Sequence, residues 1–282
     1  PAIRSLFDVA FKREDWEAAS QLSQNLSQKA LREGEPAQRS DFYYKRGLVA
    51  GHAGDVDQAA ENLVVALEIR PENLVALDAL IELCRDHPEA YDYVSTFRAL
   101  EKVYQRRDWP EAQARVLVAR GTMLEHDAAL DSAISSYREA MALAPDDFGV
   151  LRPMITLLVR LRRTDEALGE LEQFAGRLES GSEPWVDALL YSSDILSNVV
   201  MDSRRAAATL RVVLKRQSRN RDALYRHAQE LVVQGRHSDA RVVCDRLIEV
   251  AADPKNTASP VDLGRYYYYL GHVCIQDNDE KA

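Results

Sequence analysis

Prolines recur along this chain at nearly constant intervals. Pro36, Pro110, Pro184 and Pro260 are separated by 74, 74 and 76 residues. Proline has no amide hydrogen and is tolerated in the first turn of a helix, where that hydrogen would have no partner. Each proline therefore predicts the start of a helix at an equivalent place. Self-similarity at a fixed period indicates an array of stacked units rather than one globular domain.

Small residues divide this period again. A set of four residues recurs 74 positions later, and the two sets are Gly47, Ala59, Ala66, Pro71 and Gly121, Ala133, Ala140, Pro145. The spacing places each glycine on a first helix and both alanines on a second, antiparallel helix. The sequence therefore predicts helix hairpins of about 34 residues, packed closely at the small side chains.

The same pattern resembles the tetratricopeptide repeat (TPR) family. The family has a large residue, a glycine and an aromatic at fixed positions. In one copy these positions hold Tyr43, Gly47 and Leu63, and the same pattern recurs around Gly121 with Tyr137. The resemblance implies an all-α fold, a TPR-type right-handed α-solenoid of antiparallel helix pairs with seven full repeats plus one extra helix. We expect a single solenoid over residues 1–282. Its approximate units are 1–34, 38–72, 73–107, 112–146, 147–180, 185–219, 220–252 and the truncated unit 262–282.

Some copies depart from the pattern. Tyr93 takes a position where the family has alanine, so the third hairpin is expected to pack less closely. The eighth unit begins with Tyr267 to Gly271, and Tyr267 is expected to lie in the core. Because the pattern begins and stops inside repeats, we interpret the sequence as an internal piece of a longer array.

Composition narrows the class of partner. The formal net charge is −9 and the isoelectric point about 5.3, which disfavours a general nucleic-acid binder because such proteins neutralise phosphates. No apolar run is long enough to predict a membrane span, so no direct membrane insertion is expected. The 3 cysteines form no C-x-x-C pair, and we expect a reducing compartment, the cytoplasm.

Motifs of catalytic chemistry are absent from the sequence. It has no glycine-rich phosphate loop, no G-x-S-x-G and no H-E-x-x-H, which would position phosphate, a serine nucleophile or zinc. His52 and His126 are one period apart, too far to share a metal ion. We therefore predict no enzymatic activity, no cofactor and no metal, and expect function to lie on the surface.

The family resemblance also implies where that surface lies. In TPR proteins the first helices line a concave groove, and transferring the groove positions gives Tyr44, Leu48, Asp78, Glu82, Val118, Thr122, Arg152, Thr156, Ser192, Leu196, Tyr225, Gln229, Tyr268 and His272. The members that clamp the carboxylate of chaperone tails carry Lys and Asn in such places. Tyr44 and Leu48 stand here instead, which disfavours that ligand.

Two further patches are candidates for partner contact. Residues 266–269 are four consecutive tyrosines, and at 100° per residue Tyr266, Tyr268 and Tyr269 cannot all point inward. The alternative for them is packing against a neighbouring helix. A basic cluster surrounds the second helix of the sixth unit and consists of Arg204, Arg205, Arg211, Lys215, Arg216, Arg219, Arg221 and Arg226. The alternatives for this cluster are a solvated face, or ion pairs with neighbouring Glu and Asp.

The sequence thus predicts a non-enzymatic scaffold or adaptor that binds a protein partner. Degenerate paired arrays of this kind resemble those of large bacterial scaffolds, including adaptors that recruit a small Ras-like GTPase to a cell pole or serve motility and secretion assemblies. Two alternatives stay open. One is a self-assembling structural module, and the other is a regulatory domain of a larger enzyme or signalling protein.

Overall fold

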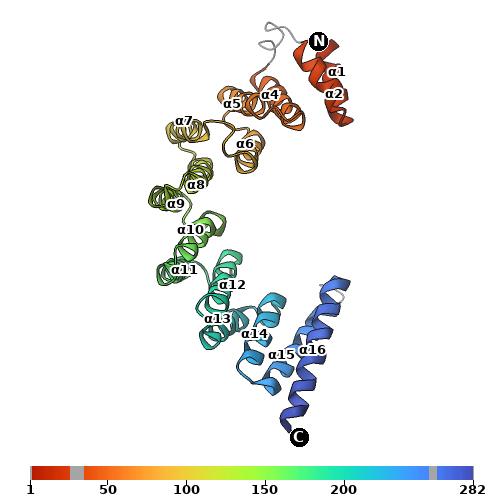
Figure 1. Cartoon of the computed structure of the whole chain (residues 1–282), viewed down its shortest axis with the longest axis vertical. Coiled ribbons are helices and arrows are strands. Elements are labelled where there is room, and N and C mark those ends of the chain that lie inside the picture. The colour runs from red at the N-terminus through yellow and green to blue at the C-terminus, as the bar shows by residue number, and fades with distance from the viewer. Residues whose placement is uncertain (1, 26–34, 254–258, 282) are drawn as a thin grey trace. The chain divides into compact units, whose positions relative to one another are not determined.

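The computed structural model describes residues 2–25, 35–253 and 259–281, and every regular element in these ranges is an α-helix (Figure 1). The contacts group the chain into two compact units, residues 1–144 and 145–282. Unit 1 contains α1 (Ala2–Lys12), α2 (Trp16–Gln24), α4 (Pro36–His52), α5 (Val56–Ile69), α6 (Leu74–Asp86), α7 (Tyr93–Arg106), α8 (Pro110–His126) and α9 (Leu130–Leu143). Unit 2 contains α10 (Phe148–Arg160), α11 (Thr164–Arg177), α12 (Glu183–Asn198), α13 (Ser203–Arg216), α14 (Arg221–Val233), α15 (His237–Ala251) and α16 (Pro260–Lys281).

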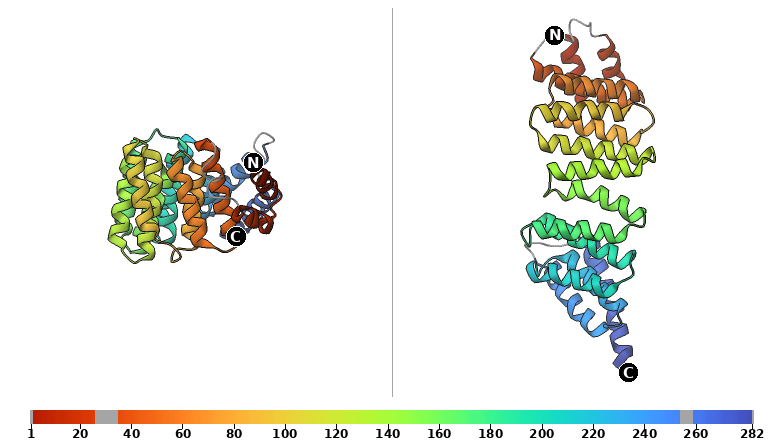
Figure 2. Two further views of the ribbon diagram at one scale, coloured as in Figure 1. Left: turned by 90° about the horizontal axis from the view of Figure 1, so that it is seen from above. Right: turned by 90° about the vertical axis from the view of Figure 1, so that its left-hand side faces the viewer.

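Consecutive helices in each unit form hairpins, and in unit 1 helices α4 to α9 lie in successive layers (Figure 2). The predicted helix starts are confirmed. Pro36, Pro110 and Pro260 are the first residues of α4, α8 and α16, and Pro184 is the second residue of α12. The all-α array of helix pairs is therefore the observed fold.

Acidic caps begin several second helices. Asp15, Asp55, Asp92 and Asp202 each accept a hydrogen bond from the backbone amide three residues later, at 3.0–3.1 Å. A carboxylate there satisfies an amide that has no partner within the helix and also faces the positive end of the helix dipole. These four aspartates thus serve helix initiation.

Two glycines set the closest approach between helices of a hairpin. A Cβ added at Gly47 would lie 2.8 Å from Leu63 Cγ, and one at Gly121 would lie 2.5 Å from Tyr137 Cε1. Both partners are buried side chains of the second helix. The third hairpin lacks such a glycine, and α6 and α7 pack less closely than α4 with α5 or α8 with α9, as predicted. Tyr93 is buried there, in a core shared with α8.

The turns inside the hairpins share a backbone conformation. Glu14, Gly54, Ala128, Arg162, Met201 and Gly235 have φ between 58° and 81° and each follows the first helix of a hairpin. This left-handed conformation caps a helix end and favours glycine, because other residues place Cβ against the backbone. Four of these six positions carry a residue other than glycine, and the backbone is strained there.

Candidate functional site

The first helices of unit 1 carry charged residues that pair across neighbouring hairpins. Asp78 of α6 accepts a hydrogen bond from the guanidinium of Arg115 on α8 at 3.1 Å. Lys45 Nζ of α4 lies 2.9 Å from Asp8 Oδ1 of α1 and 2.7 Å from Asp41 Oδ2 of its own helix. The predicted groove residue Asp78 is therefore already held by a cation. These pairs fix the arrangement of polar groups on this surface.

Aromatic and apolar side chains lie among these ion pairs. Tyr44 is half-buried, and burial together with nearby carboxylates, Glu82 among them, raises the pKa of its phenol. Leu48 is also half-buried, whereas Glu82 is exposed. Thr122 is half-buried, and its hydroxyl donates to the Val118 carbonyl oxygen within α8 and lies 3.4 Å from the Tyr137 hydroxyl of α9. The first-helix surface of unit 1, which we define as Tyr44, Leu48, Asp78 and Glu82, is amphipathic and partly pre-paired.

In unit 2 the predicted positions separate into two groups. Thr156 of α10 lies 2.9 Å from the hydroxyl of Tyr191 on α12, and the Arg152 guanidinium carbon lies 5.8 Å from the centre of the Tyr191 ring. Ser192 and Leu196 instead line a pocket of about 390 Å³ with residues of the second helices α11 and α13. The groove prediction for Ser192 and Leu196 is wrong. Tyr191, one residue earlier, is the side chain that faces the preceding first helix.

Tyr225 of α14 is occupied by contacts within unit 2. The centre of its ring lies 5.5 Å from the ring centres of both Tyr266 and Tyr269 on α16. The Arg265 guanidinium carbon lies 4.7 Å from the centre of the Tyr225 ring. Gln229 of the same helix is half-buried. Tyr266 is buried against the preceding hairpin, so most of its surface serves the core rather than an open partner surface.

The placement of Tyr267 contradicts the sequence prediction. It is 55% exposed, and Tyr268 is 79% exposed. In the fourth hairpin, Gly121 packs against α9, but nothing lies within 4 Å of a Cβ at Gly271. No described residue covers this face of α16, which is why Tyr267 lies in solvent. His272 is exposed on the same helix.

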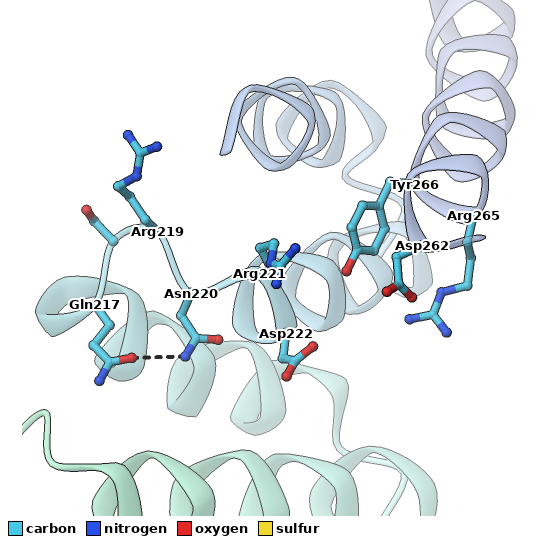
Figure 3. Close-up of a pocket in the computed structure, with 9 residues that line it drawn as sticks. Gln217, Arg219, Asn220, Arg221, Asp222, Asp262, Arg265 and Tyr266 are labelled. Atoms are coloured by element: carbon cyan, nitrogen blue, oxygen red, sulfur yellow. Dashed lines mark hydrogen bonds between the residues drawn. The ribbon is translucent and has the colours of Figure 1, made fainter. Parts of the chain in front are cut away.

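A polar pocket of about 650 Å³ lies where α14 and α16 begin (Figure 3). Its lining includes Arg221 and Arg265 together with Asp222 and Asp262. Asn220 anchors the edge of the pocket, because its amide donates to Gln217 Oε1 at 3.0 Å and its carbonyl oxygen accepts from a backbone amide of α14 at 2.9 Å. Charges of both signs line this pocket, so its own carboxylates partly neutralise its guanidinium groups.

Part of the predicted basic cluster is paired within unit 2. Arg226 lies 2.5 Å from Asp194 Oδ2 on α12, and burial raises the pKa of that carboxyl group while Arg226 lowers it. Arg219 pairs with Asp253. These two arginines join elements of unit 2, as the structural alternative for the cluster predicted.

The rest of the cluster remains on the surface. Arg211, Lys215 and Arg216 are exposed on α13, and no ion pair joins them to another described residue. Arg204 and Arg211 line a pocket of about 380 Å³ with Arg236. The structure thus separates the sequence cluster into a paired group, an exposed group on α13, and Arg221, which lines the polar pocket at the start of α14.

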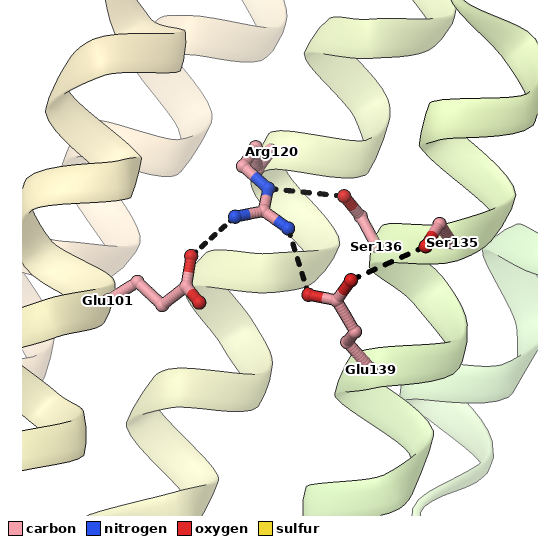
Figure 4. A network of polar contacts seen from close by, with 5 residues as sticks. All are labelled: Glu101, Arg120, Ser135, Ser136 and Glu139. Atoms are coloured by element: carbon pink, nitrogen blue, oxygen red, sulfur yellow. Dashed lines mark hydrogen bonds and ion pairs between the residues drawn. The ribbon is translucent and has the colours of Figure 1, made fainter.

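One network in unit 1 has no signal in the sequence. Arg120 of α8 pairs with Glu101 of α7, and it also bonds Glu139 and Ser136 of α9 at 3.0 and 3.1 Å (Figure 4). Ser135 donates to Glu139 at 3.3 Å. The Arg120 side chain is largely buried. It joins three helices from two hairpins and has a structural role.

No group of three or more His, Cys, Asp or Glu side chains within the described ranges is placed to hold a metal ion. Cys84 and Cys244 are buried, and burial raises the pKa of each thiol to about 12, whereas Cys274 is half-buried. Across the described helices, none is long and apolar enough to cross a membrane.

A scan of known protein families gives no match, and a search of curated proteins gives none either. Among solved structures, a tetratricopeptide repeat protein from Parabacteroides merdae matches 86% of this chain and 93% of its own, with 13% identity and a TM-score of 0.45. PilF of Pseudomonas aeruginosa matches 78% of this chain and 96% of its own, with 20% identity and a TM-score of 0.46. The TPR2AB domain of yeast Sti1 matches 83% of this chain and 99% of its own, with 13% identity and a TM-score of 0.38.

Proposed function

We propose that this chain, an array of TPR-type helix hairpins, is a non-enzymatic scaffold that binds a protein partner through its first helices. The observation that supports this most is the first-helix surface of unit 1. There an aromatic, an aliphatic and two acidic side chains lie on neighbouring hairpins, and ion pairs such as Asp78 to Arg115 hold part of the surface in place. A surface that is ordered before binding loses less side-chain entropy on association.

Affinity capture from the source cells tests this proposal. The bait is the full chain as wild type, as Tyr44→Ala/Glu82→Ala, and as the control Glu61→Ala/Glu68→Ala, which changes exposed residues of the second helix α5. A protein recovered by wild type and control but lost by the first-helix variant supports the scaffold. Equal recovery with all three baits contradicts binding through these helices.

The sequence resemblance suggests a finer partner class, a small Ras-like GTPase or a component of a motility, polarity or secretion assembly. The same capture addresses it when repeated with a GTP analogue and with GDP in the lysate. A GTPase partner predicts a recovered GTPase whose yield depends on the nucleotide. Recovery of partners that lack a nucleotide-binding domain would exclude that class and retain the scaffold.

Self-association is a second candidate, favoured by one face of α16. Val261, Tyr268 and Ile275 are seven residues apart, so they lie on one stripe of the helix, and all three are exposed. We expect the mass measured by light scattering to rise with concentration and Tyr268→Ser to reduce this rise. A constant monomer mass would exclude this candidate.

A further inference from the structure

Two neighbouring hairpin turns of unit 2 expose apolar side chains. The α12–α13 turn exposes residues 199–201, and Met201 is 79% exposed; the α14–α15 turn exposes Val233, at 72%. The turns lie side by side because Gln234 Nε2 donates to the carbonyl and hydroxyl oxygens of Ser203 at 2.9 and 3.0 Å. Exposed apolar groups that gather in one place are typical of an interaction surface.

The α12–α13 turn is longer than its counterparts. In five hairpins the turn closes with a backbone hydrogen bond to the residue five positions earlier, namely Asp15 to Ala10, Asp55 to Ala50, Ala129 to Leu124, Arg163 to Leu158 and Arg236 to Leu231. In the sixth hairpin the bond runs from Asp202 to Leu196, six positions earlier, at 2.8 Å. The turn therefore contains one additional residue, which places Val199, Val200 and Met201 outside the regular packing.

An arginine pocket adjoins these turns. Its volume is about 380 Å³, and its lining consists of Arg204, Ala207, Arg211, Gln234 and Arg236, with no carboxylate. Arg236 is bonded to Asp239 at 2.8 Å, while Arg204 and Arg211 have no ion-pair partner among the described side chains.

The electrostatic environment next to this pocket is positive. Burial and the charges of Arg211 and Arg236 together lower the pKa of the adjacent His227 to about 4, and Asp239 opposes them. This positive site stands in a chain whose formal net charge is −9. It thus offers local charge complementarity to an acidic partner that most of the chain would repel.

We infer that these turns and the arginine pocket bind an acidic segment of a partner protein that also carries apolar side chains. The Arg–Val patch consists of residues 199–201, Val233, Arg204, Arg211 and Arg236. Guanidinium groups bind carboxylates through paired hydrogen bonds, while the exposed apolar groups of the turns are covered by the partner's apolar residues. This inference rests on the proposed scaffold function and names a second contact surface for it, at the hairpin turns of unit 2.

Fluorescence anisotropy on the full chain tests the inference with a labelled peptide, Glu-Asp-Leu-Glu-Phe-Asp-Glu-Leu. Two comparison peptides replace either the apolar residues by Ser or the acidic residues by Lys. The charge variant is Arg211→Glu, with Arg246→Glu as its matched control, since Arg246 is exposed on α15 and outside the patch. The apolar variant is Val233→Ser, with Val242→Ser as its control, since Val242 of α15 is 68% exposed.

We expect saturable binding of the acidic apolar peptide that weakens as salt rises. Arg211→Glu should weaken it about tenfold or more, because a charged hydrogen bond is lost and repulsion replaces it, and Val233→Ser should weaken it about fivefold. The two control variants should bind like wild type. All four substitutions change exposed side chains, and circular dichroism confirms that each variant is folded.

Three results would overturn the inference: no binding, equal binding of the acidic Ser peptide, or equal losses in the control variants. Failure of the scaffold function is distinguishable from failure of this site. A partner captured through Tyr44 and Glu82 but indifferent to Arg211→Glu keeps the scaffold and removes the patch as a contact. Peptide binding that depends on Arg211 and Val233, with no partner recovered by capture, supports the patch and counts against the first-helix surface.

Discussion

Replacing Gly121 by alanine perturbs the closest contact between two helices of a hairpin. The added Cβ would lie 2.5, 2.8 and 2.9 Å from three ring carbons of Tyr137. That ring is fully buried, and its hydroxyl donates to Glu125 Oε1 at 2.5 Å. The ring has no space to retreat without losing this bond, so α8 and α9 must move apart.

The expected magnitude follows from two opposing effects. Inserting a methyl group into a packed core costs about 1–3 kcal/mol, and alanine in place of glycine recovers about 1 kcal/mol of helix propensity. With partial loss of the Tyr137 bond, at about 1 kcal/mol, we expect a net destabilisation of about 1–3 kcal/mol. Urea unfolding followed by circular dichroism at the helix band measures this as a lower midpoint for the unit 1 transition.

Gly169→Ala is the matched control, since this glycine lies inside α11 and a Cβ there meets nothing within 4 Å. It should stabilise unit 2 by about 0.5–1 kcal/mol through helix propensity alone. A Gly121→Ala variant as stable as wild type would refute the argument that glycine at this position is required by the helix contact.

Three other predictions concern stability. Arg120→Met removes the cation that pairs with Glu101 and should cost about 2 kcal/mol in urea unfolding, because the carboxylate stays partly buried without a partner; an unchanged midpoint would contradict this role. Ala128→Gly should stabilise by about 0.5 kcal/mol and Gly54→Ala should destabilise by about 1 kcal/mol, because both positions have positive φ; shifts of the opposite sign would count against strain at these turns. The pKa of His227 is lowered to about 4 in the folded chain, so the unfolded chain binds more protons below its ordinary pKa, and the free energy of unfolding should fall as the pH drops from about 6.5 to about 4. Urea unfolding across this range should show a smaller loss of stability for His227→Gln than for wild type. An identical pH dependence of the two proteins would contradict the assignment to His227.

Local signals in the sequence predicted much of the fold. The prolines mark helix starts because the effect of a missing amide hydrogen is decided within one turn. Gly47 and Gly121 predicted close helix pairs, and Tyr93 predicted the looser third hairpin, because side-chain size at a contact limits the approach of two backbones. These features depend on few residues and short separations.

The candidate site was predicted less well because it depends on what covers each helix. Tyr267 has the periodicity of a core residue, yet no described residue packs on that face. Ser192 and Leu196 were assigned to the groove by spacing, but they line a pocket with residues of the second helices α11 and α13. The Arg120 network joins residues 16 to 19 positions apart with no motif.

The additional residue in the α12–α13 turn was also missed. Spacing did not show it, because the interval from the predicted groove position to the capping aspartate is 7 residues for Leu48 and Asp55 and 6 residues for Leu196 and Asp202. Which basic residues remain unpaired is a property of tertiary contacts. Arg219 and Arg226 find carboxylates on other elements, whereas nothing in the sequence distinguishes them from their neighbours on α13.

Hydrogen–deuterium exchange on the full chain, alone and with the partner recovered by capture, tests the scaffold account most directly. The account predicts slower exchange in peptides from the first helices α4 and α6 when the partner is bound, with the second helices α5 and α7 unchanged. Protection confined to α5 and α7, or no protection in any described helix, would contradict a scaffold that binds through its first helices.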